Sequence, residues 1–174
     1  MLMRIAVLGA MIVAARSLAT TAFAQAPSAE LRDPFLDRFV GEWHVTRTFP
    51  NRPAAENIVR AQWTLNHQWI ELQYRDVAVP AKYEADVFIG FDAAKKRYVC
   101  HWMENFGGSE SSLGWGTIDD KLLSLEIKFD NGELTNRFTF DPRTNSWTSL
   151  IRQVEHGEWK TFCEDKFVRT DAKK

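Results

Sequence analysis

Aromatic side chains carry much of the chemistry that this sequence offers. Seven tryptophans are spread along the chain, at Trp43, Trp63, Trp69, Trp102, Trp115, Trp147 and Trp159. Rings of this kind either fill a core or line a site for a flat or apolar ligand. Both roles stay open for each ring. The sequence predicts that Trp63, Trp102 and Tyr83 line a ligand cavity.

Arg47 is the candidate for a polar contact with that ligand. Trp43, Val45, Arg47 and Phe49 alternate, so an inward Trp43 would turn Arg47 inward too. An unpaired charge inside a barrel is costly, so an inward Arg47 would bind a ligand's carboxylate. An outward Arg47 would instead form a salt bridge at the strand end. The sequence does not decide between the two.

His101 and Glu104 are the remaining candidates for ligand contact, and they could also supply acid–base groups. Alternation places Tyr98 and Glu104 on one face of a strand and His101 on the other, which makes a local dyad awkward. The sequence contains no nucleophile elbow, phosphate loop or metal-ligand spacing. We therefore expect no metal and name no catalytic residue, although an enzyme acting on a small molecule remains an alternative.

Ten segments with period-two alternation must position these residues. They are Glu42–Phe49, Asn57–Leu65, Trp69–Val77, Tyr83–Phe91, Arg97–Asn105, Ser111–Ile118, Leu122–Phe129, Glu133–Phe140, Trp147–Glu155 and Glu158–Arg169. Turn residues such as Asp130-Asn131-Gly132 separate them. The short connections predict antiparallel pairing, and closure into an up-and-down barrel would remove both sheet edges. A two-sheet sandwich is the structural alternative.

The first 24 residues read as a signal peptide. Arg4 precedes an apolar run, and small residues allow cleavage after Ala24 or Ala26. This predicts a periplasmic or secreted protein without a membrane anchor. Residues 29–170 would form a single domain that begins with a short helix over Ala29–Val40.

The charge of the chain argues against a nucleic-acid partner. Removing the signal peptide leaves 20 basic and 23 acidic side chains, whereas nucleic-acid binders need a basic face. The oligomeric state is not indicated. Cys100 and Cys163 fall on the fifth and tenth strands, so we expect two free, buried thiols rather than a disulfide.

Gly41-Glu42-Trp43, between the expected helix and the first strand, resembles the Gly-x-Trp signature of lipocalins and related calycin barrels. In that family the Trp packs on the barrel floor beneath a cavity, and a basic side chain of the last strand covers it. The resemblance implies that Trp43 and Arg169 form such a floor. Some ten-stranded relatives bind haem through a C-terminal histidine, but Glu158–Arg169 contains none, so no cofactor is expected.

Further motifs are similar to those of a bacterial lipocalin-like family described as a domain of unknown function. They are Gln68-Trp69-Ile70-Glu71-Leu72-Gln73-Tyr74, Ile89-Gly90-Phe91-Asp92, Tyr98-Val99-Cys100-His101-Trp102-Met103-Glu104 and Gly114-Trp115-Gly116. The resemblance implies a barrel that binds a small apolar or amphipathic ligand. An interaction domain without a cavity is the remaining alternative.

Overall fold

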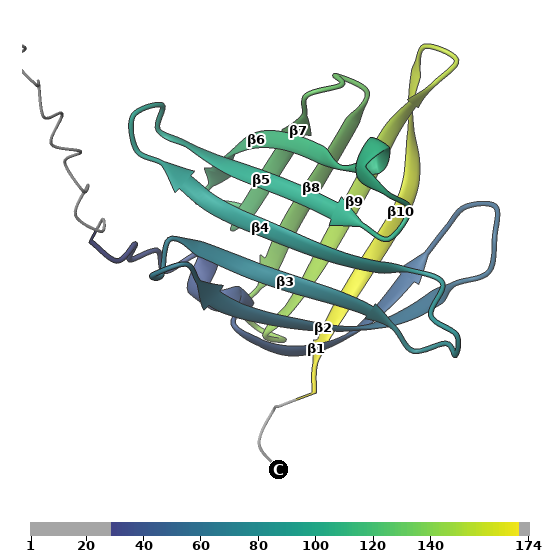
Figure 1. Ribbon diagram of the computed structural model, residues 1–174, viewed down its shortest axis with the longest axis horizontal. Helices are drawn as coiled ribbons and strands as arrows, with labels where there is room; N and C mark the ends of the chain where they lie inside the picture. Colours follow the sequence, from purple (N-terminus) through teal and green to yellow (C-terminus); the bar gives the residue numbers. More distant parts are fainter. Residues whose placement is uncertain (1–28, 171–174) are drawn as a thin grey trace, which may run out of the picture.

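Residues 29–170, the part of the chain that the computed structural model describes, form a closed barrel of ten antiparallel strands (Figure 1). The strands follow one another around the ring, and β1 pairs with β10 to close it. They are β1 (Gly41–Thr48), β2 (Ala55–Thr64), β3 (Trp69–Asp76), β4 (Glu84–Asp92), β5 (Arg97–Glu104), β6 (Ser112–Asp119), β7 (Ser124–Phe129), β8 (Leu134–Asp141), β9 (Ser146–Glu155) and β10 (Glu158–Arg169). The predicted all-β up-and-down barrel is confirmed.

Strand β7 begins two residues later than the sequence predicted. The carboxylate of Asp119 accepts hydrogen bonds from the backbone N–H groups of Lys121 and Leu122. Leu123 has a φ of 47°, which is turn geometry. The side chain of Asp119 thus holds Leu122 in the turn before β7, although its apolar character fits a strand.

The predicted helix over Ala29–Val40 is much shorter in the structure. A single 3₁₀ turn, η1 (Leu36–Phe39), is present. Asp33 accepts hydrogen bonds from the N–H groups of Phe35 and Leu36, which begins the turn. The preceding residues form no helix, and the backbone pairs elsewhere: the N–H of Leu31 bonds to the carbonyl of His67 at 3.0 Å.

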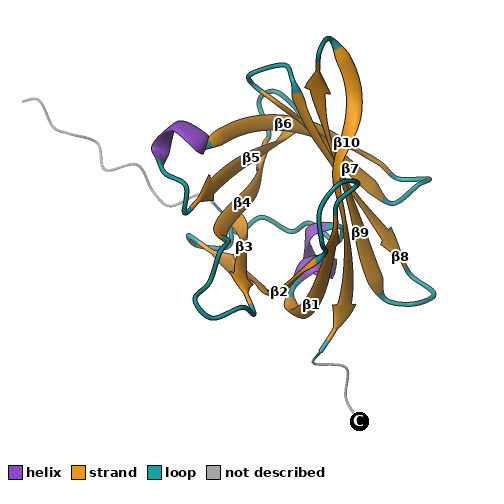
Figure 2. Cartoon of the chain, turned by 90° about the vertical axis from the view of Figure 1, so that its right-hand side faces the viewer, coloured by secondary structure: helices purple, strands orange, loops and turns teal. Residues whose placement is uncertain are grey.

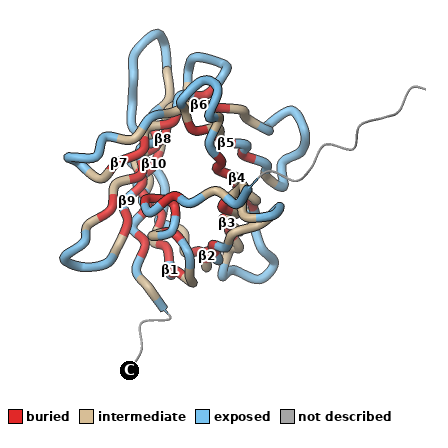
Figure 3. Tube along the Cα trace, turned by 90° about the vertical axis from the view of Figure 1, so that its left-hand side faces the viewer, coloured by how far each residue is buried: buried red, intermediate tan, exposed pale blue. Residues whose placement is uncertain are grey.

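The two ends of the barrel differ. At the plugged end, η1 lies within the ring of strands (Figure 2), and its Leu36 and Phe39 are almost fully buried. At the loop end, the longer connections 49–54, 77–83 and 105–111 leave the strands, and the last of them contains η2 (Gly108–Glu110). Buried residues alternate along the strands, so the core lies inside the ring (Figure 3).

Strand β6 approaches β7 closely because of its glycines. A Cβ atom on Gly116 would lie 2.2 Å from the carbonyl oxygen of Glu126. A Cβ on Gly114 would lie 2.6 Å from the Cγ2 of Ile127. The missing side chains therefore allow Ile127 of β7 to occupy the interior beside β6.

The predicted signal peptide, residues 1–24, lies outside the described residues. Between residues 29 and 170, none of the helices has the length and apolar character required to cross a bilayer.

Candidate functional site

Arg47 points into the barrel and forms a buried ion pair. It lies opposite Asp165 across the β1–β10 seam. Its Nε and Nη2 atoms donate to Oδ1 and Oδ2 of Asp165, each at 2.8 Å. Arg47 is 5% exposed and Asp165 is fully buried. This bidentate geometry is what a desolvated arginine needs to keep its charge.

The ion pair belongs to a polar belt on the inner wall of the barrel. We use this name for the buried polar residues of six neighbouring strands, Asn57, Tyr74, Arg47, Asp165, Ser149 and Asn136. Ser149 lies opposite Asp165 in the ladder and its hydroxyl donates to Oδ1 of Asn136 at 2.7 Å. The belt extends from β3 through the β1–β10 seam to β8.

Three members of the belt have buried polar atoms without a partner. Both amide atoms of Asn57, the hydroxyl of Tyr74 and the amide nitrogen of Asn136 lack a hydrogen bond within the described chain. Asn57 and Asn136 are each 1% exposed, and Tyr74 is fully buried. More than about 90% of buried polar groups in proteins are hydrogen-bonded, so four such atoms inside one barrel are unusual.

An aromatic arc completes the ring at the level of the belt. It consists of Tyr74 on β3, Tyr83 just before β4, Trp102 on β5 and Phe129 on β7. The ring centroids of Tyr74 and Trp102 lie 5.5 Å apart, and those of Trp102 and Phe129 lie 6.4 Å apart. The indole N–H of Trp102 donates to the hydroxyl of Tyr83 at 3.1 Å.

The arc and the belt meet at Arg47. Its Cζ atom lies 4.7 Å from the ring centroid of Tyr83 and 5.5 Å from that of Tyr74. Such cation–π contacts stabilise a desolvated guanidinium. The candidate site therefore joins a paired charge, unpartnered amides and flat rings.

Burial sets the protonation states in this region. Burial is the main cause that raises the pKa of Tyr83 to about 12 and the pKa of Tyr74 well above its usual value. Both hydroxyls therefore stay neutral and can donate hydrogen bonds. Burial also raises the pKa of Glu104, whereas the neighbouring Tyr83 and Arg47 lower it. Glu104 is half-buried at the rim of the loop end.

Of the predicted ligand contacts, Arg47, Tyr83, Trp102 and Glu104 come together in the structure. Trp102 and Glu104 share the inward phase of β5, as alternation indicated. Each lies beside Tyr83, which in turn contacts Arg47.

His101 does not join this group. It lies on the outside of the barrel, where its ring packs 5.5 Å from that of Trp69. The two residues beside it on β5, Cys100 and Trp102, point inward, so the pleat turns His101 away. His101 thus lies outside the group of residues that face the interior, on the face of β5 opposite Glu104, and its role in a ligand site stays a prediction.

Trp63 lies at the plugged end, remote from Arg47. Its indole N–H donates to Asp37 at 2.9 Å, and its ring stacks on His67 at 4.1 Å. In the ladder Arg47 pairs with Ala55, eight residues away along β2, which corresponds to about 26 Å. Trp63 therefore packs against the plug and does not share a site with Arg47.

Trp43 and Arg169 adopt the contact that the sequence suggested. The guanidinium carbon of Arg169 lies 4.5 Å from the ring centroid of Trp43. The indole N–H of Trp43 donates to the carbonyl of Phe39 at 2.7 Å, which ties the first strand to η1. This pair lies at the plugged end, below the polar belt.

Asp165, Asn57, Tyr74 and Asn136 were missed in the sequence analysis, although the sequence contains a signal for each. Each is a polar residue in the inward phase of its strand: Asn57 precedes Val59 and Ala61 by steps of two. The same holds for Asp165 before Phe167. Polar residues at inward positions of an alternating strand are candidates for a site.

Cys100 and Cys163 are both free and buried. Burial raises the pKa of the Cys163 thiol to about 12, and it raises that of Cys100 as well. Neither thiol is activated as a nucleophile. Among residues 29–170, no group of three His, Cys, Asp or Glu side chains is arranged to hold a metal ion.

A family model described as "Protein of unknown function (DUF1579)" matches residues 30–169, which includes every strand of the barrel. No curated protein matches the chain.

Proposed function

The chain belongs to the DUF1579 family of proteins of unknown function, and on that premise we propose that it binds a small amphipathic ligand inside the barrel. The ligand would lie at the level of the polar belt, between the aromatic arc and the β1–β10 seam. The observation that carries the proposal is the group of unpartnered polar atoms on Asn57, Tyr74 and Asn136.

Unpartnered buried groups are costly, which argues for a partner. Leaving a buried donor or acceptor unsatisfied costs about 1–3 kcal/mol. Asn57 and Tyr74, which hold three of the four such atoms, lie on the adjacent strands β2 and β3, and the aromatic arc begins at Tyr74. A molecule with one polar group and one apolar, flat or flexible part would satisfy both surfaces.

The pairing of Arg47 changes the ligand chemistry from what the sequence suggested. Asp165 already occupies two of the donor groups of Arg47, and its negative charge would repel a second carboxylate. Asn57 offers both a donor and an acceptor without a partner. We therefore propose a neutral polar group, such as an amide or a hydroxyl, rather than a carboxylate.

Two further features of this proposal concern family and location. The contact of Arg169 with Trp43, the tryptophan of the Gly41-Glu42-Trp43 motif, supports a lipocalin-like relationship within the calycin barrels. The signal-peptide pattern of residues 1–24 supports a periplasmic or secreted location. Such a protein would bind its ligand outside the cytoplasm.

The test is ligand binding by the full protein recovered from the periplasmic fraction, whose mass also reports cleavage after Ala24 or Ala26. N-phenyl-1-naphthylamine, a neutral apolar fluorophore, should bind saturably and gain fluorescence. Dodecanamide should displace it better than dodecanoate by about tenfold, or about 1.4 kcal/mol. Tyr83→Leu should weaken binding of the fluorophore by about tenfold.

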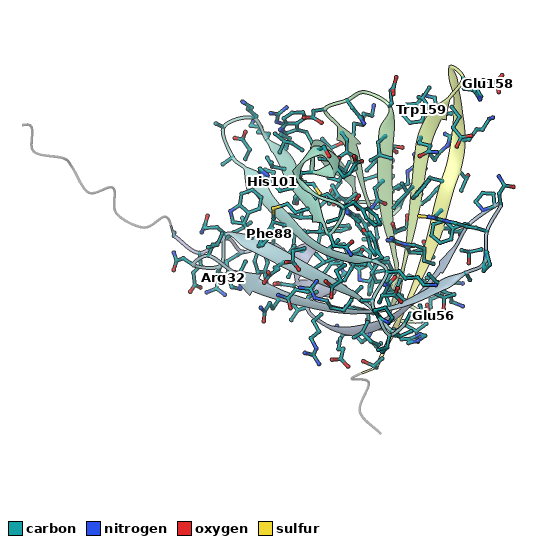
Figure 4. All side chains as sticks on the ribbon, turned by 45° about the vertical axis from the view of Figure 1, so that its right-hand side comes forward. Arg32, Glu56, Phe88, His101, Glu158 and Trp159 are labelled. Carbon is teal, nitrogen blue, oxygen red and sulfur yellow. The ribbon has the colours of Figure 1, made fainter. Side chains whose placement is uncertain are left out.

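Trp159→Leu is the matched control, because Trp159 is 42% exposed on the β9–β10 hairpin, away from the belt. It should leave binding unchanged. Figure 4 shows Trp159 near the tip of this hairpin. Failure of the fluorophore to bind, or equal weakening by Trp159→Leu and Tyr83→Leu, would overturn the proposal. If dodecanoate competes better than dodecanamide, the proposed neutral group is wrong.

A further inference from the structure

The outside of the barrel carries an apolar patch that the proposed ligand site does not use. We call the outward side chains of two adjacent cross-strand rows the outer patch: Trp69, Val99 and Trp115 in the first row, and Phe88, His101 and Leu113 in the second. They come from β3, β4, β5 and β6. Phe88 and His101 lie on the same wall (Figure 4).

A glycine within the outer patch makes room for one of its aromatic rings. Gly90 lies between Trp69 and Val99 in the first row, and a Cβ there would come within 2.8 Å of the Trp69 ring. The missing side chain allows the indole to lie against the sheet. Met103, next to the patch on β5, is 43% exposed.

Cross-strand ion pairs lie close to the outer patch, including Arg75 with Asp86 on β3 and β4. The neighbouring strands carry further pairs of this kind, as expected for the wet face of an antiparallel sheet, including Arg60 with Glu42 and Arg137 with Glu126. A contiguous apolar group bordered by charged pairs indicates a contact with another molecule.

Opposite charges flank the outer patch at equal distances from its centre. Glu71 on β3 is the cross-strand neighbour of Phe88, and Lys128 on β7 is the neighbour of Trp115. Each lies two strands from β5, on opposite sides. Neither forms a salt bridge within residues 29–170.

This arrangement is self-complementary. A two-fold axis that lies in the interface and follows β5 brings β3 of one copy over β7 of the other, and β4 over β6. Glu71 then faces Lys128 of the second copy, and the same contact occurs twice. The two residues are offset by one row along the strands, about 7 Å.

We propose that the outer patch is the interface of a symmetric dimer of this chain. Phe88 of one copy packs over Leu113 and Trp115 of the other, and two Glu71–Lys128 ion pairs close the flanks. A hollow of about 980 Å³ on the outer wall, lined in part by Trp115, Lys128 and Arg97, lies where side chains of the second copy enter. The ligand site inside the barrel is not part of the interface, so the two proposals stand independently.

Sedimentation velocity over a range of protein concentrations tests the dimer. The wild type should form dimers at micromolar concentrations, and Phe88→Glu should be monomeric while its circular dichroism is unchanged. Val168→Glu is the matched control: Val168 is an outward apolar residue, 49% exposed, on β10 across the barrel, and it should leave the dimer intact.

Exchanging the charges of Glu71 and Lys128 distinguishes this dimer from one formed through other contacts. Glu71→Lys and Lys128→Glu should each weaken dimerisation by about tenfold, because each places like charges together twice. The double variant should restore it to within about threefold of the wild type, since the pairs are reversed but intact. A monomeric wild type, or a double variant as weak as the single ones, would overturn the proposal.

Discussion

The plugged end and the polar belt differ in whether their buried polar groups have hydrogen-bond partners. At the plugged end, the hydroxyl of Tyr98 donates to Asp33 at 2.6 Å, and the indole of Trp43 donates to the carbonyl of Phe39. At the belt, the hydroxyl of Tyr74 and both amide atoms of Asn57 have no partner within the described chain. The two regions belong to one continuous core.

The difference indicates which region the fold uses for stability and which is free for function. Satisfied polar groups fix the orientation of η1 and exclude alternatives for it. Unsatisfied ones cost stability, and natural proteins retain such costs where function requires them. The ion pair of Arg47 and Asp165 combines both features. Each charge has the other as its partner, but burial removes both from water.

Breaking that ion pair should have the largest effect. Asp165→Asn removes the charge that compensates Arg47 and should lower the free energy of unfolding by about 3–5 kcal/mol. Chemical denaturation measures this. The double variant Arg47→Met with Asp165→Leu should recover most of the loss, because no charge is then buried. A cost of Asp165→Asn below about 1 kcal/mol would show that Arg47 is solvated in solution.

A pair of tyrosine variants compares the two regions directly. Tyr98→Phe removes the hydrogen bond to Asp33 and should cost about 1–3 kcal/mol. Tyr74→Phe removes a hydroxyl without a partner in the protein and should cost less than about 0.5 kcal/mol. Thermal unfolding of both variants side by side gives the comparison. Equal costs would mean that the hydroxyl of Tyr74 has a partner of comparable strength, and the contrast between the regions would fail.

The sequence predicted the barrel well because local signals determine it. Alternation fixed the inward face of each strand, and turn residues such as Asp130-Asn131-Gly132 fixed the hairpins. The N-terminal helix was overestimated for a different reason. Leu31 and Phe35 have helical spacing, but the backbone of Leu31 pairs with the turn at His67, a contact 36 residues away. Tertiary pairing of this kind overrides local periodicity.

The site was predicted only in part, and the missing part is long-range. Arg47 and Asp165 are 118 residues apart, so their pairing follows only from the register of the β1–β10 seam. Trp63 points inward, as alternation predicts, but it lies at the opposite end of the barrel from Arg47. Alternation predicts the face of a side chain and not its height in the barrel. His101 is a candidate for its chemistry alone, because alternation turns its side chain to the face of β5 opposite Glu104.

Asn57→Leu should change both the stability and the ligand preference, which makes it the sharpest test of the comparison. The leucine side chain has a similar size and removes two unpartnered polar atoms from the core, so the free energy of unfolding should rise by about 1–2 kcal/mol. Dodecanamide should lose its advantage over dodecanoate in displacing the fluorophore, because the amide partner is gone. Asn136→Leu is a poor control, since it also removes the partner of Ser149. A stabilised Asn57→Leu variant that no longer distinguishes the two competitors would show that Asn57 serves the ligand at the expense of the fold. A destabilised variant would show instead that the amide has a structural partner, and the belt would then resemble the plugged end.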